Sequence, residues 1–447
     1  MNIILNGQLI RGKSQGTAYS TYSTSYKKAM HYLKNHSIKD ALGNPELTSD
    51  VLYQIVNLKA FILQLQYFGL TIDQKEFNDF IKQYFDEHKY KQVEFVRFNE
   101  DFIKRFGIDW LKVLPEWYTV NRVPSYIIRE CFIETVEGDM KEPDYSKRRY
   151  RIRASIYNNS DVDGVVSLNY SLMPKMEAGT AMMKYTSEDM NNRSQNVLIE
   201  AGKAKEIIIL CKAQLAQVSL NMNISGNLPS VISLSPYGSG RETRETSSGI
   251  KDIDLSRFFP KEGELIVDNE SSGFRLLNVP SGNQLRRWFK TSDTTKYKDF
   301  YKVTFAEEWT LSVHDGFYGG HIRSGWRKEG GDGSSRVEWS TRIEKAGYYE
   351  VFAYIPSQLS LVQIKASHSV VFGIQKQTPI KQLYLVRHDG SESEVELEIP
   401  FAQREWLSLG RFYFSPGEAS VILTDKKCTA DQVIYADAVK WVYEGEK

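Results

Sequence analysis

The chain of 447 residues is about three times as long as a typical domain, and its 41% hydrophobic and 25% charged residues are those of a folded protein. Its 57 Lys and Arg residues against 56 Asp and Glu give a formal charge of +1, so electrostatics provide no reason to expect nucleic acid or an anionic membrane as a partner. Three cysteines, none in a C-x-x-C pair, argue against a disulfide framework and a thiolate zinc cluster.

Residues 1–118 are predicted to be mostly helical, and the clearest helix starts near Asp73. From there, apolar side chains recur at the i, i+3, i+4, i+7 and i+8 spacing that forms one stripe along a helix. The stripe consists of Phe77, Phe80, Ile81, Tyr84 and Phe85. For the next helix, Asn99 is predicted as the N-cap and Gly107 as the residue at its C-terminal end.

The hydrophobic period changes to that of β-strands from Tyr126 onward. Over residues 149–157, polar and apolar residues alternate, which places one set in a core and turns the arginines toward water. A turn and a second strand-like segment follow. Short β-rich segments of this kind predict an immunoglobulin-like β-sandwich over residues 119–235.

Residues 236–262 are predicted to be a linker, because Gly, Ser, Thr and charged residues follow one another there without a sustained period. A second all-β region is expected over residues 263–447, where glycine-containing turn signals separate strand-like segments. The predicted fold class is therefore a multidomain α+β protein, with an N-terminal helical region followed by two all-β sandwich domains.

The sequence contains no run of about 18 uninterrupted apolar residues, and no signal peptide at its start. The chain as given is therefore not expected to span a membrane, and an export signal would have to lie upstream of Met1. If such a segment exports the protein, we expect it in the periplasm, on the cell surface or outside the cell.

The residues that could carry chemistry form no recognised catalytic pattern. The histidines include no H-E-x-x-H pair, and neither a G-x-S-x-G elbow nor a G-x-x-x-x-G-K-[ST] loop occurs. His314 and Asp315, with His321 nearby, are candidates for metal ligands or for a base and its orienting carboxylate. In the alternative interpretation, which we favour, they are turn residues that bond to local backbone. We therefore predict no catalytic residue, no metal site and no cofactor.

Aromatic residues are the other candidate for function, because flat rings offer an apolar face to sugar C–H edges or to apolar side chains. Six of the eight tryptophans lie from Trp288 onward. Trp339, Trp406 and Trp441 lie in strand-like alternation and are predicted to be core residues. A second group flanks glycines in a predicted loop and is expected to be exposed for ligand contact. This group consists of Phe317, Tyr318, His321 and Trp326.

Two stretches of the chain resemble known families, and the first covers about 70 residues of the helical region. Its segments are K-A-F-I-L-Q-L at 59–65, D-F at 101–102, G-I-D-W at 107–110 and W-Y-T-V-N-R-V-P at 117–124. In order and spacing these segments resemble the closing helices of the catalytic domain in the aminopeptidase N-type zinc metallopeptidases (gluzincins), which precede a β-sandwich.

The chain departs from this family at the residues that would carry catalysis. The zinc-binding H-E-x-x-H and its distant glutamate are missing, Asn57 occupies the position of the family's transition-state-stabilising Tyr, and Ala60 stands where Gly is usual. An asparagine is shorter than a tyrosine and places its donor differently beside a developing oxyanion. The resemblance therefore implies that residues 1–118 are a helical remnant of a gluzincin catalytic domain, and we expect no peptidase activity from this chain alone.

The second resemblance covers about 140 residues of the C-terminal region. Its segments are Y-G-x-x-I-R-S at 318–324, A-G-Y-Y-E-V-F-A-Y-I-P at 346–356, W-L-S-L-G-R-F-Y-F at 406–414 and A-D-A-V-K-W at 436–441. They are similar to the carbohydrate-binding-module-like β-sandwich at the C-terminus of golvesin and xanthan lyases. The resemblance implies a domain of this kind over residues 263–447, as on envelope and secreted bacterial proteins. Asp437 is interpreted as a structural hydrogen-bonding residue rather than a catalytic acid.

We interpret the chain as a non-catalytic bacterial cell-envelope or extracellular protein whose C-terminal β-sandwich binds glycan or a partner domain. One alternative is the C-terminal portion of a larger zinc aminopeptidase-like protein, with or without a membrane anchor, whose catalytic residues lie upstream of this chain. Another alternative is a purely structural spacer, in which both sandwiches only pack against neighbouring domains.

Overall fold

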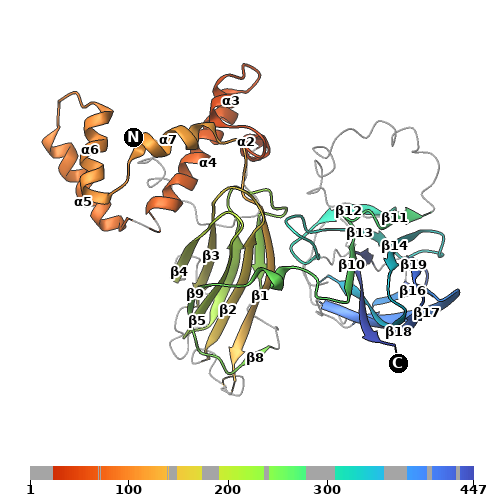
Figure 1. The fold of residues 1–447 in the computed structure, drawn as a ribbon. Coiled ribbons are helices and arrows are strands. Elements are labelled where there is room, and N and C mark those ends of the chain that lie inside the picture. Colours follow the sequence, from red (N-terminus) through yellow and green to blue (C-terminus); the bar gives the residue numbers. More distant parts are fainter. Residues whose placement is uncertain are drawn as a thin grey trace, which may run out of the picture. The chain divides into compact units, whose positions relative to one another are not determined.

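The described residues up to Thr119 are mainly helical, and those from Tyr126 onward form mainly β-strands (Figure 1). The computed structural model describes residues 24–68, 70, 72–137, 139, 148–173, 191–235, 241–277, 308–356, 380–399, 405–428 and 433–446. In this part of the chain, a helical region followed by β-sandwiches confirms the predicted fold class. The chain divides into two units, Met1–Leu255 and Ser256–Lys447, each with an apolar core of its own.

Local sequence signals set where helices begin and end in the helical region. It comprises α2 (Thr24–Tyr32), α3 (Ile38–Leu42), α4 (Ser49–Phe68), α5 (Gln74–Glu87), α6 (Phe95–Phe106) and α7 (Trp110–Thr119). The helix α5 starts next to Asp73, as predicted, and Asp73 is its N-cap, because its side chain accepts hydrogen bonds from the backbone N–H groups of Lys75 and Glu76. The apolar stripe of α5 packs into a cluster with α6 and α7, apart from Phe85, which is half exposed.

The expectation that Asn99 caps a helix is wrong, because α6 begins at Phe95 and Asn99 lies inside it. The buried Asn99 side chain instead ties α6 to the next helix. Its Nδ2 donates to Asp109 Oδ1 at 2.8 Å, and its Oδ1 accepts the Trp110 N–H at 2.7 Å. The end of α6 is as predicted, since Gly107 follows it in the left-handed conformation with a φ of 71°.

The first sandwich consists of two sheets in the described part of its unit. One has the strand order β8-β1-β2-β5-β9 and the other the order β4-β3-β6-β7. The strands are β1 (Tyr126–Val136), β2 (Tyr150–Asn158), β3 (Gly164–Leu172), β4 (Asn191–Ile199), β5 (Ala204–Cys211), β6 (Leu215–Asn221), β7 (Val231–Leu234), β8 (Glu242–Thr243) and β9 (Gly249–Asp252). Inward-facing residues of both sheets share one apolar core.

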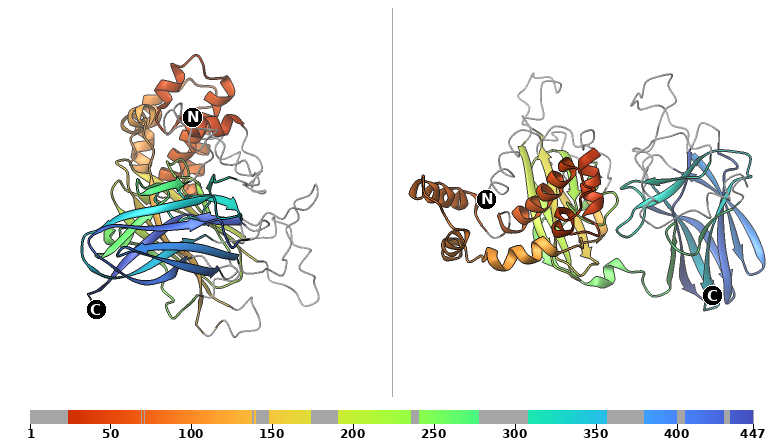
Figure 2. Two further views of the ribbon diagram at one scale, coloured as in Figure 1. Left: turned by 90° about the vertical axis from the view of Figure 1, so that its right-hand side faces the viewer. Right: turned by 90° about the horizontal axis from the view of Figure 1, so that it is seen from above.

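Two neighbouring segments add to this sandwich. The segment 236–262, predicted to be a linker, contains β8 and β9, which pair with β1 and β5 at the two edges of one sheet. At one end of the sandwich, Ile224 joins the apolar cluster formed by α2, α3 and α4, so the helices pack against that end (Figure 2). The helical region and the first sandwich therefore share buried surface.

The second unit contains three sheets among its described residues, with the orders β10-β21-β15-β18, β11-β14-β19-β16-β17 and β12-β13-β20. After a short 3-10 turn, η4 (Leu255–Phe258), the strands are β10 (Glu264–Asp268), β11 (Phe274–Leu277), β12 (Thr310–Val313), β13 (Ser324–Glu329), β14 (Arg336–Ile343), β15 (Gly347–Ile355), β16 (Ile380–His388), β17 (Ser391–Ile399), β18 (Glu405–Phe414), β19 (Gly417–Thr424), β20 (Val433–Ala436) and β21 (Ala438–Gly445). The two larger sheets share one core, in which Trp339 and Trp441 are buried as predicted.

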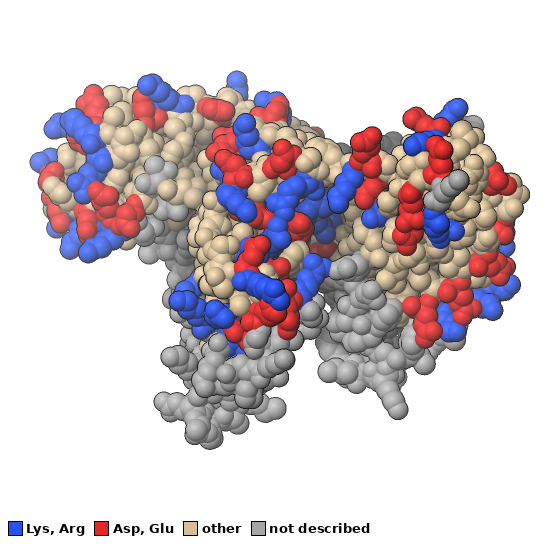
Figure 3. Space-filling view, turned by 60° about the horizontal axis from the view of Figure 1, so that its bottom comes forward, with Lys and Arg blue, Asp and Glu red and all other residues tan. Residues whose placement is uncertain are grey.

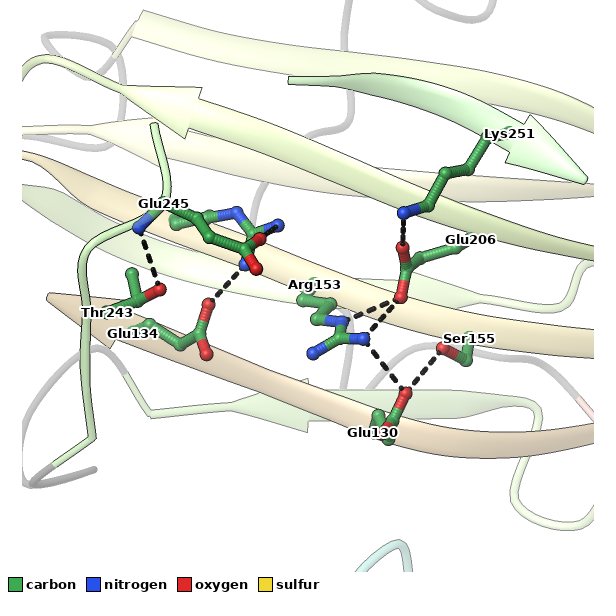
Figure 4. Close-up of polar contacts among 9 residues, drawn as sticks. Glu130, Glu134, Arg153, Ser155, Glu206, Thr243, Glu245 and Lys251 are labelled. Carbon is green, nitrogen blue, oxygen red and sulfur yellow. Dashed lines mark hydrogen bonds and ion pairs between the residues drawn. The ribbon is translucent and has the colours of Figure 1, made fainter. Parts of the chain in front are cut away.

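The outer face of the β8-β1-β2-β5-β9 sheet carries charged side chains (Figure 4). Arg151 lies on this face, but the expectation that it points into water is wrong, because only 2% of its side chain is exposed. Its guanidinium donates to Glu134 Oε2 at 2.8 Å and to Glu245 Oε2 at 2.6 Å. Glu245 belongs to the segment between β8 and β9, which passes from the β1 edge of the sheet to the β5 edge and so covers Arg151.

Glu206 on β5 is the buried centre of a second group of charges on the same face (Figure 4). Its carboxylate accepts a hydrogen bond from Arg153 Nε at 2.7 Å and lies 2.8 Å from Lys251 Nζ. Burial by itself raises the pKa of Glu206, but the hydrogen bonds and charges of Lys251 and Arg153 outweigh it and lower the pKa from 4.5 to about 2. The ionised carboxylate therefore stabilises the fold above about pH 4.5, and this contribution is lost as the pH falls toward 2.

We expect Glu206→Gln to destabilise the first sandwich at pH 7 by about 3 kcal/mol, because the neutral amide removes the buried counter-charge of Arg153 and Lys251. The difference from the unmodified chain should shrink as the pH falls from 4.5 to about 2, where Glu206 itself becomes protonated. Urea unfolding at each pH, followed by hydrogen exchange of β2 and β5 peptides, measures the free energy of unfolding of both chains. Glu130→Gln is the matched control, because Glu130 also contacts Arg153, at 3.3 Å, but is 40% exposed. An equal loss in both variants would contradict the prediction.

Candidate functional site

The loop between β12 and β13 holds three of the residues predicted to contact a ligand, and the first of them is buried. The expectation that Phe317 is exposed is wrong, because its ring is completely buried beside His314 and Tyr435. Gly325 makes room for this ring, since a Cβ atom at Gly325 would lie 2.3 Å from Phe317 Cε1. Phe317 therefore anchors the loop.

Two further residues of the predicted group, His321 and Trp326, differ in their exposure to solvent. His321 is exposed, and ligand contact by it stays a prediction. Trp326 lies on β13, where its half-buried ring stacks on Phe274 with a centroid distance of 6.4 Å and packs against the core of the second sandwich. Trp326 thus faces the interior, and its packing there accounts for a large aromatic residue at this position without a ligand.

Tyr318 turns toward β15 and β18, where it meets two more aromatic side chains. Its ring centroid lies 5.5 Å from that of Tyr354 and 5.1 Å from that of Trp406, and these two rings are 5.2 Å apart. All three side chains are only partly buried. The prediction that Trp406 is a core residue is therefore wrong, because β18 turns it to the outer face of the sheet. We call Tyr318, Tyr354 and Trp406 the aromatic cluster.

Asp437 fixes the position of Tyr318 through a hydrogen bond to its backbone. It stands between β20 and β21 with 1% of its surface exposed, and its Oδ2 accepts the Tyr318 N–H at 2.9 Å. Its backbone carbonyl accepts a hydrogen bond from Trp339 Nε1 at 3.0 Å. Burial raises the pKa of Asp437 well above its ordinary value, and the charge of Asp268 acts in the same direction. These contacts agree with the structural role predicted for Asp437.

Lys440 on β21 adds a polar group beside the aromatic cluster. Its ammonium lies 4.8 Å from the ring centroid of Trp406, 5.0 Å from that of Phe352 and 3.9 Å from a carboxylate oxygen of Glu264. Burial lowers the pKa of Lys440, which the neighbouring Glu264 carboxylate partly offsets. The site thus combines apolar ring surface with a donor and an acceptor, as a ligand with C–H edges and hydroxyl groups requires.

The residues considered for catalysis or metal binding have local partners. The Gly316 N–H donates to His314 Nδ1 at 3.0 Å, which agrees with the favoured interpretation of His314 and Asp315 as turn residues. Within the described ranges, no group of three or more His, Cys, Asp or Glu side chains is placed to hold a metal ion. None of the helices in the described part of the chain combines the length and the apolar character that a membrane crossing needs.

The residues that resemble aminopeptidases have packing and capping roles in the helices. Asp109 is the N-cap of α7, and Trp110 is buried. Trp117 Nε1 donates to the backbone carbonyl of Lys59 at 2.9 Å, which joins α7 to α4. Burial lowers the pKa of the Lys59 side chain to about 8. Helix packing therefore accounts for the order and spacing of these residues.

Residues 293–443 match the family model of the Golvesin C-terminal domain. The matched range lies in the second unit and contains the aromatic cluster and Lys440, which confirms the golvesin part of the predicted resemblance. None of the comparisons supports the predicted relation of residues 1–118 to aminopeptidases. No curated protein matches the chain.

Solved structures with some similarity include xanthan lyase from Paenibacillus, at 12% identity and a TM-score of 0.27, covering 73% of this chain and 26% of that one. A CBM35 module of Abf62 from Cellvibrio japonicus has 14% identity and a TM-score of 0.23, covering 41% of this chain and 94% of that one. The GH26-CBM35 β-(1,4)-mannanase of Podospora anserina has 12% identity and a TM-score of 0.21, covering 32% and 28%. The chain thus spans about a quarter of the length of the xanthan lyase.

We expect Phe317→Ala to destabilise the second sandwich by about 3–5 kcal/mol, because it empties a completely buried ring site. Gly325→Ala should cost about 1–3 kcal/mol, because its new methyl group occupies the space of the same ring. Hydrogen exchange of β13 peptides in urea measures both effects. His321→Ala is the control in the same loop, and its effect should stay within about 0.5 kcal/mol because the side chain is exposed. Unchanged stability in Phe317→Ala would contradict the anchoring role.

Proposed function

We propose that this chain is a glycan-binding protein and that the aromatic cluster of its second unit is the contact surface. The observation that carries the proposal is the meeting of three partly exposed rings from three separate segments, a loop, β15 and β18. Aromatic surface left in water costs free energy, so a fold that gathers rings on an outer sheet face instead of its core favours a binding role.

The chemistry of the cluster suits a sugar. Rings of Tyr and Trp cover the C–H edges of a pyranose with few side-chain torsions to immobilise, which keeps the entropic cost of binding low. Lys440 and Glu264 lie next to the rings and provide hydrogen-bonding partners for hydroxyl groups. Figure 3 shows basic and acidic side chains interspersed on one face of the molecule, and the formal charge of the whole chain is +1.

We further propose that the chain is non-catalytic and that it acts at the bacterial cell envelope or outside the cell. The first part of this proposal is supported by the turn contact of His314, whose Nδ1 accepts the Gly316 N–H at 3.0 Å and also lies 2.9 Å from Asp315 Oδ1. The match of residues 293–443 to the Golvesin C-terminal domain supports the second part through the resemblance to envelope and secreted proteins.

We expect the full chain to bind at least one class of polysaccharide on a glycan array, and Trp406→Ala to weaken that binding at least about tenfold, because it removes a ring that can stack on a sugar. Tyr90→Ala is the matched control, since it removes a tyrosine that is 95% exposed in the first unit. Circular dichroism and thermal unfolding establish that each variant is folded.

Two outcomes would contradict the proposal. Glycan binding that survives both Trp406→Ala and Tyr318→Ala would remove the aromatic cluster from the site. An array without any bound glycan, together with capture of a protein domain by the unmodified chain but not by Trp406→Ala, would assign the cluster to a protein partner.

A further inference from the structure

The aromatic cluster is one end of a longer row of side chains on the outer face of the β10-β21-β15-β18 sheet. Along β15, every second residue is partly exposed, while the residues between them are buried. These partly exposed residues are Tyr348, Glu350, Phe352 and Tyr354. Their cross-strand partners on β18 are Tyr413, Arg411, Ser408 and Trp406, in the same order. We call these eight side chains, with Lys440 of β21, the outer strip.

A β-bulge keeps both strands of the outer strip in phase. The pairing register between β15 and β18 shifts by one residue midway, where Gly410 has a φ of 122°. As a result Ser408 and Arg411, three residues apart in the sequence, are both exposed, while Leu409 between them is buried. Uninterrupted alternation would have turned Arg411 toward the core.

The end of the outer strip away from the aromatic cluster carries a second group of rings. The centroids of Tyr348 and Tyr413 are 5.4 Å apart, and the Arg411 guanidinium lies 4.3 Å from the Tyr348 ring centroid. Between the two aromatic ends, Ser408 Oγ donates to Glu350 Oε1 at 2.8 Å. Tyr348 and Tyr354 are six residues apart on one strand, which corresponds to about 20 Å at the rise of a β-strand.

We infer that the outer strip binds an extended stretch of neutral, equatorially linked glycan chain that runs along β15 and contacts both aromatic ends. This inference rests on the proposed function and names the class of glycan. A single hexopyranose is several-fold shorter than the strip of about 20 Å, so one terminal sugar reaches only one of the two aromatic ends. Contact with both ends therefore requires several consecutive sugars.

The charges of the outer strip favour a neutral glycan over a carboxylated one. Arg411 Nε lies 2.8 Å from Glu444 Oε2, and Lys440 Nζ lies 3.9 Å from Glu264 Oε1, so both cations already have an acidic neighbour. Glu350 adds a further negative charge in the middle of the strip. A carboxylated glycan would meet these three carboxylates, whereas sugar hydroxyl groups can both donate to the carboxylates and accept from the cations.

The straight course of the outer strip favours equatorial linkages. A chain of β-1,4-linked glucose or mannose, in which both linkage bonds are equatorial, is an extended ribbon whose flat faces expose C–H groups, whereas an α-1,4-linked glucose chain coils. Rings placed along one strand of a sheet lie in a row, and only the ribbon keeps successive sugars over such a row. The same reasoning predicts that affinity grows with chain length until the ribbon covers both aromatic ends.

The test is isothermal titration calorimetry of the full chain with β-1,4-linked glucose oligomers from cellobiose to cellohexaose. We expect cellohexaose to bind at least about tenfold more tightly than cellobiose. Tyr413→Ala, which removes a ring that is 37% exposed at the far end, should abolish this gain, and Tyr348→Ala should do the same. Maltohexaose is the matched control for linkage, and mannohexaose against the β-1,4-linked hexamer of mannuronate is the matched control for charge. Maltohexaose and the mannuronate hexamer should each bind at least about tenfold more weakly than their counterparts.

The outcomes separate this inference from the proposed function. Two results would overturn the extended strip and leave glycan binding in place. One is an affinity that does not depend on chain length. The other is that Tyr413→Ala and Tyr348→Ala bind cellohexaose like the unmodified chain, while Trp406→Ala does not. Equal or tighter binding of maltohexaose than of cellohexaose would overturn the inferred linkage class. Equal or tighter binding of the mannuronate hexamer than of mannohexaose would overturn the inferred charge class. If the chain binds other glycans on the array but not cellohexaose, the inferred class of glycan is also overturned. The proposed function itself is overturned by other results: the absence of every glycan from the array, or glycan binding that survives both Trp406→Ala and Tyr318→Ala.

Discussion

One hydrogen bond, from the Tyr318 N–H to the side chain of the buried Asp437, positions the loop residue of the aromatic cluster. Asp437 stands where the chain leaves one sheet and enters another, since Ala436 pairs with β13 and Ala438 pairs with β10. The position of Asp437 is therefore fixed by two sheets at once. Because Tyr318 is bonded to Asp437, the position of this loop residue is fixed as well. Phe317, one residue earlier, is buried under the same loop, so the anchor and the exposed ring are neighbours in the sequence.

Local signals in the sequence predicted the features that depend on neighbours along the chain. The carboxylate of Asp73 reaches the first N–H groups of α5, and Gly107 adopts the left-handed conformation after α6, both within one helical turn. The alternation that marks strands was equally reliable for Trp339 and Trp441, because both lie on regularly paired strands that face the core.

Features that depend on distant residues were missed, each for a specific physical reason. The burial of Phe317 requires the missing Cβ of Gly325, and the exposure of Trp406 depends on which face of β18 meets the core. Asn99 bonds to residues of the next helix, and Arg151 is covered by a segment that crosses the sheet. A bulge, a crossing segment or a close approach changes which side of an element is buried without changing the local pattern of residue types.

The outer sheet faces of the two sandwiches differ in how their side chains are satisfied, and this difference supports the binding role proposed for the second unit. In the first, Glu206 and Arg151 are buried within ion pairs, so an approaching ligand would have to break contacts that cost several kcal/mol to disrupt. In the second, the rings of Tyr354 and Trp406 retain exposed apolar surface, and covering it releases water at no such cost. Exposed apolar surface gains free energy when a partner covers it, which supports the outer face with the exposed rings as the proposed contact surface.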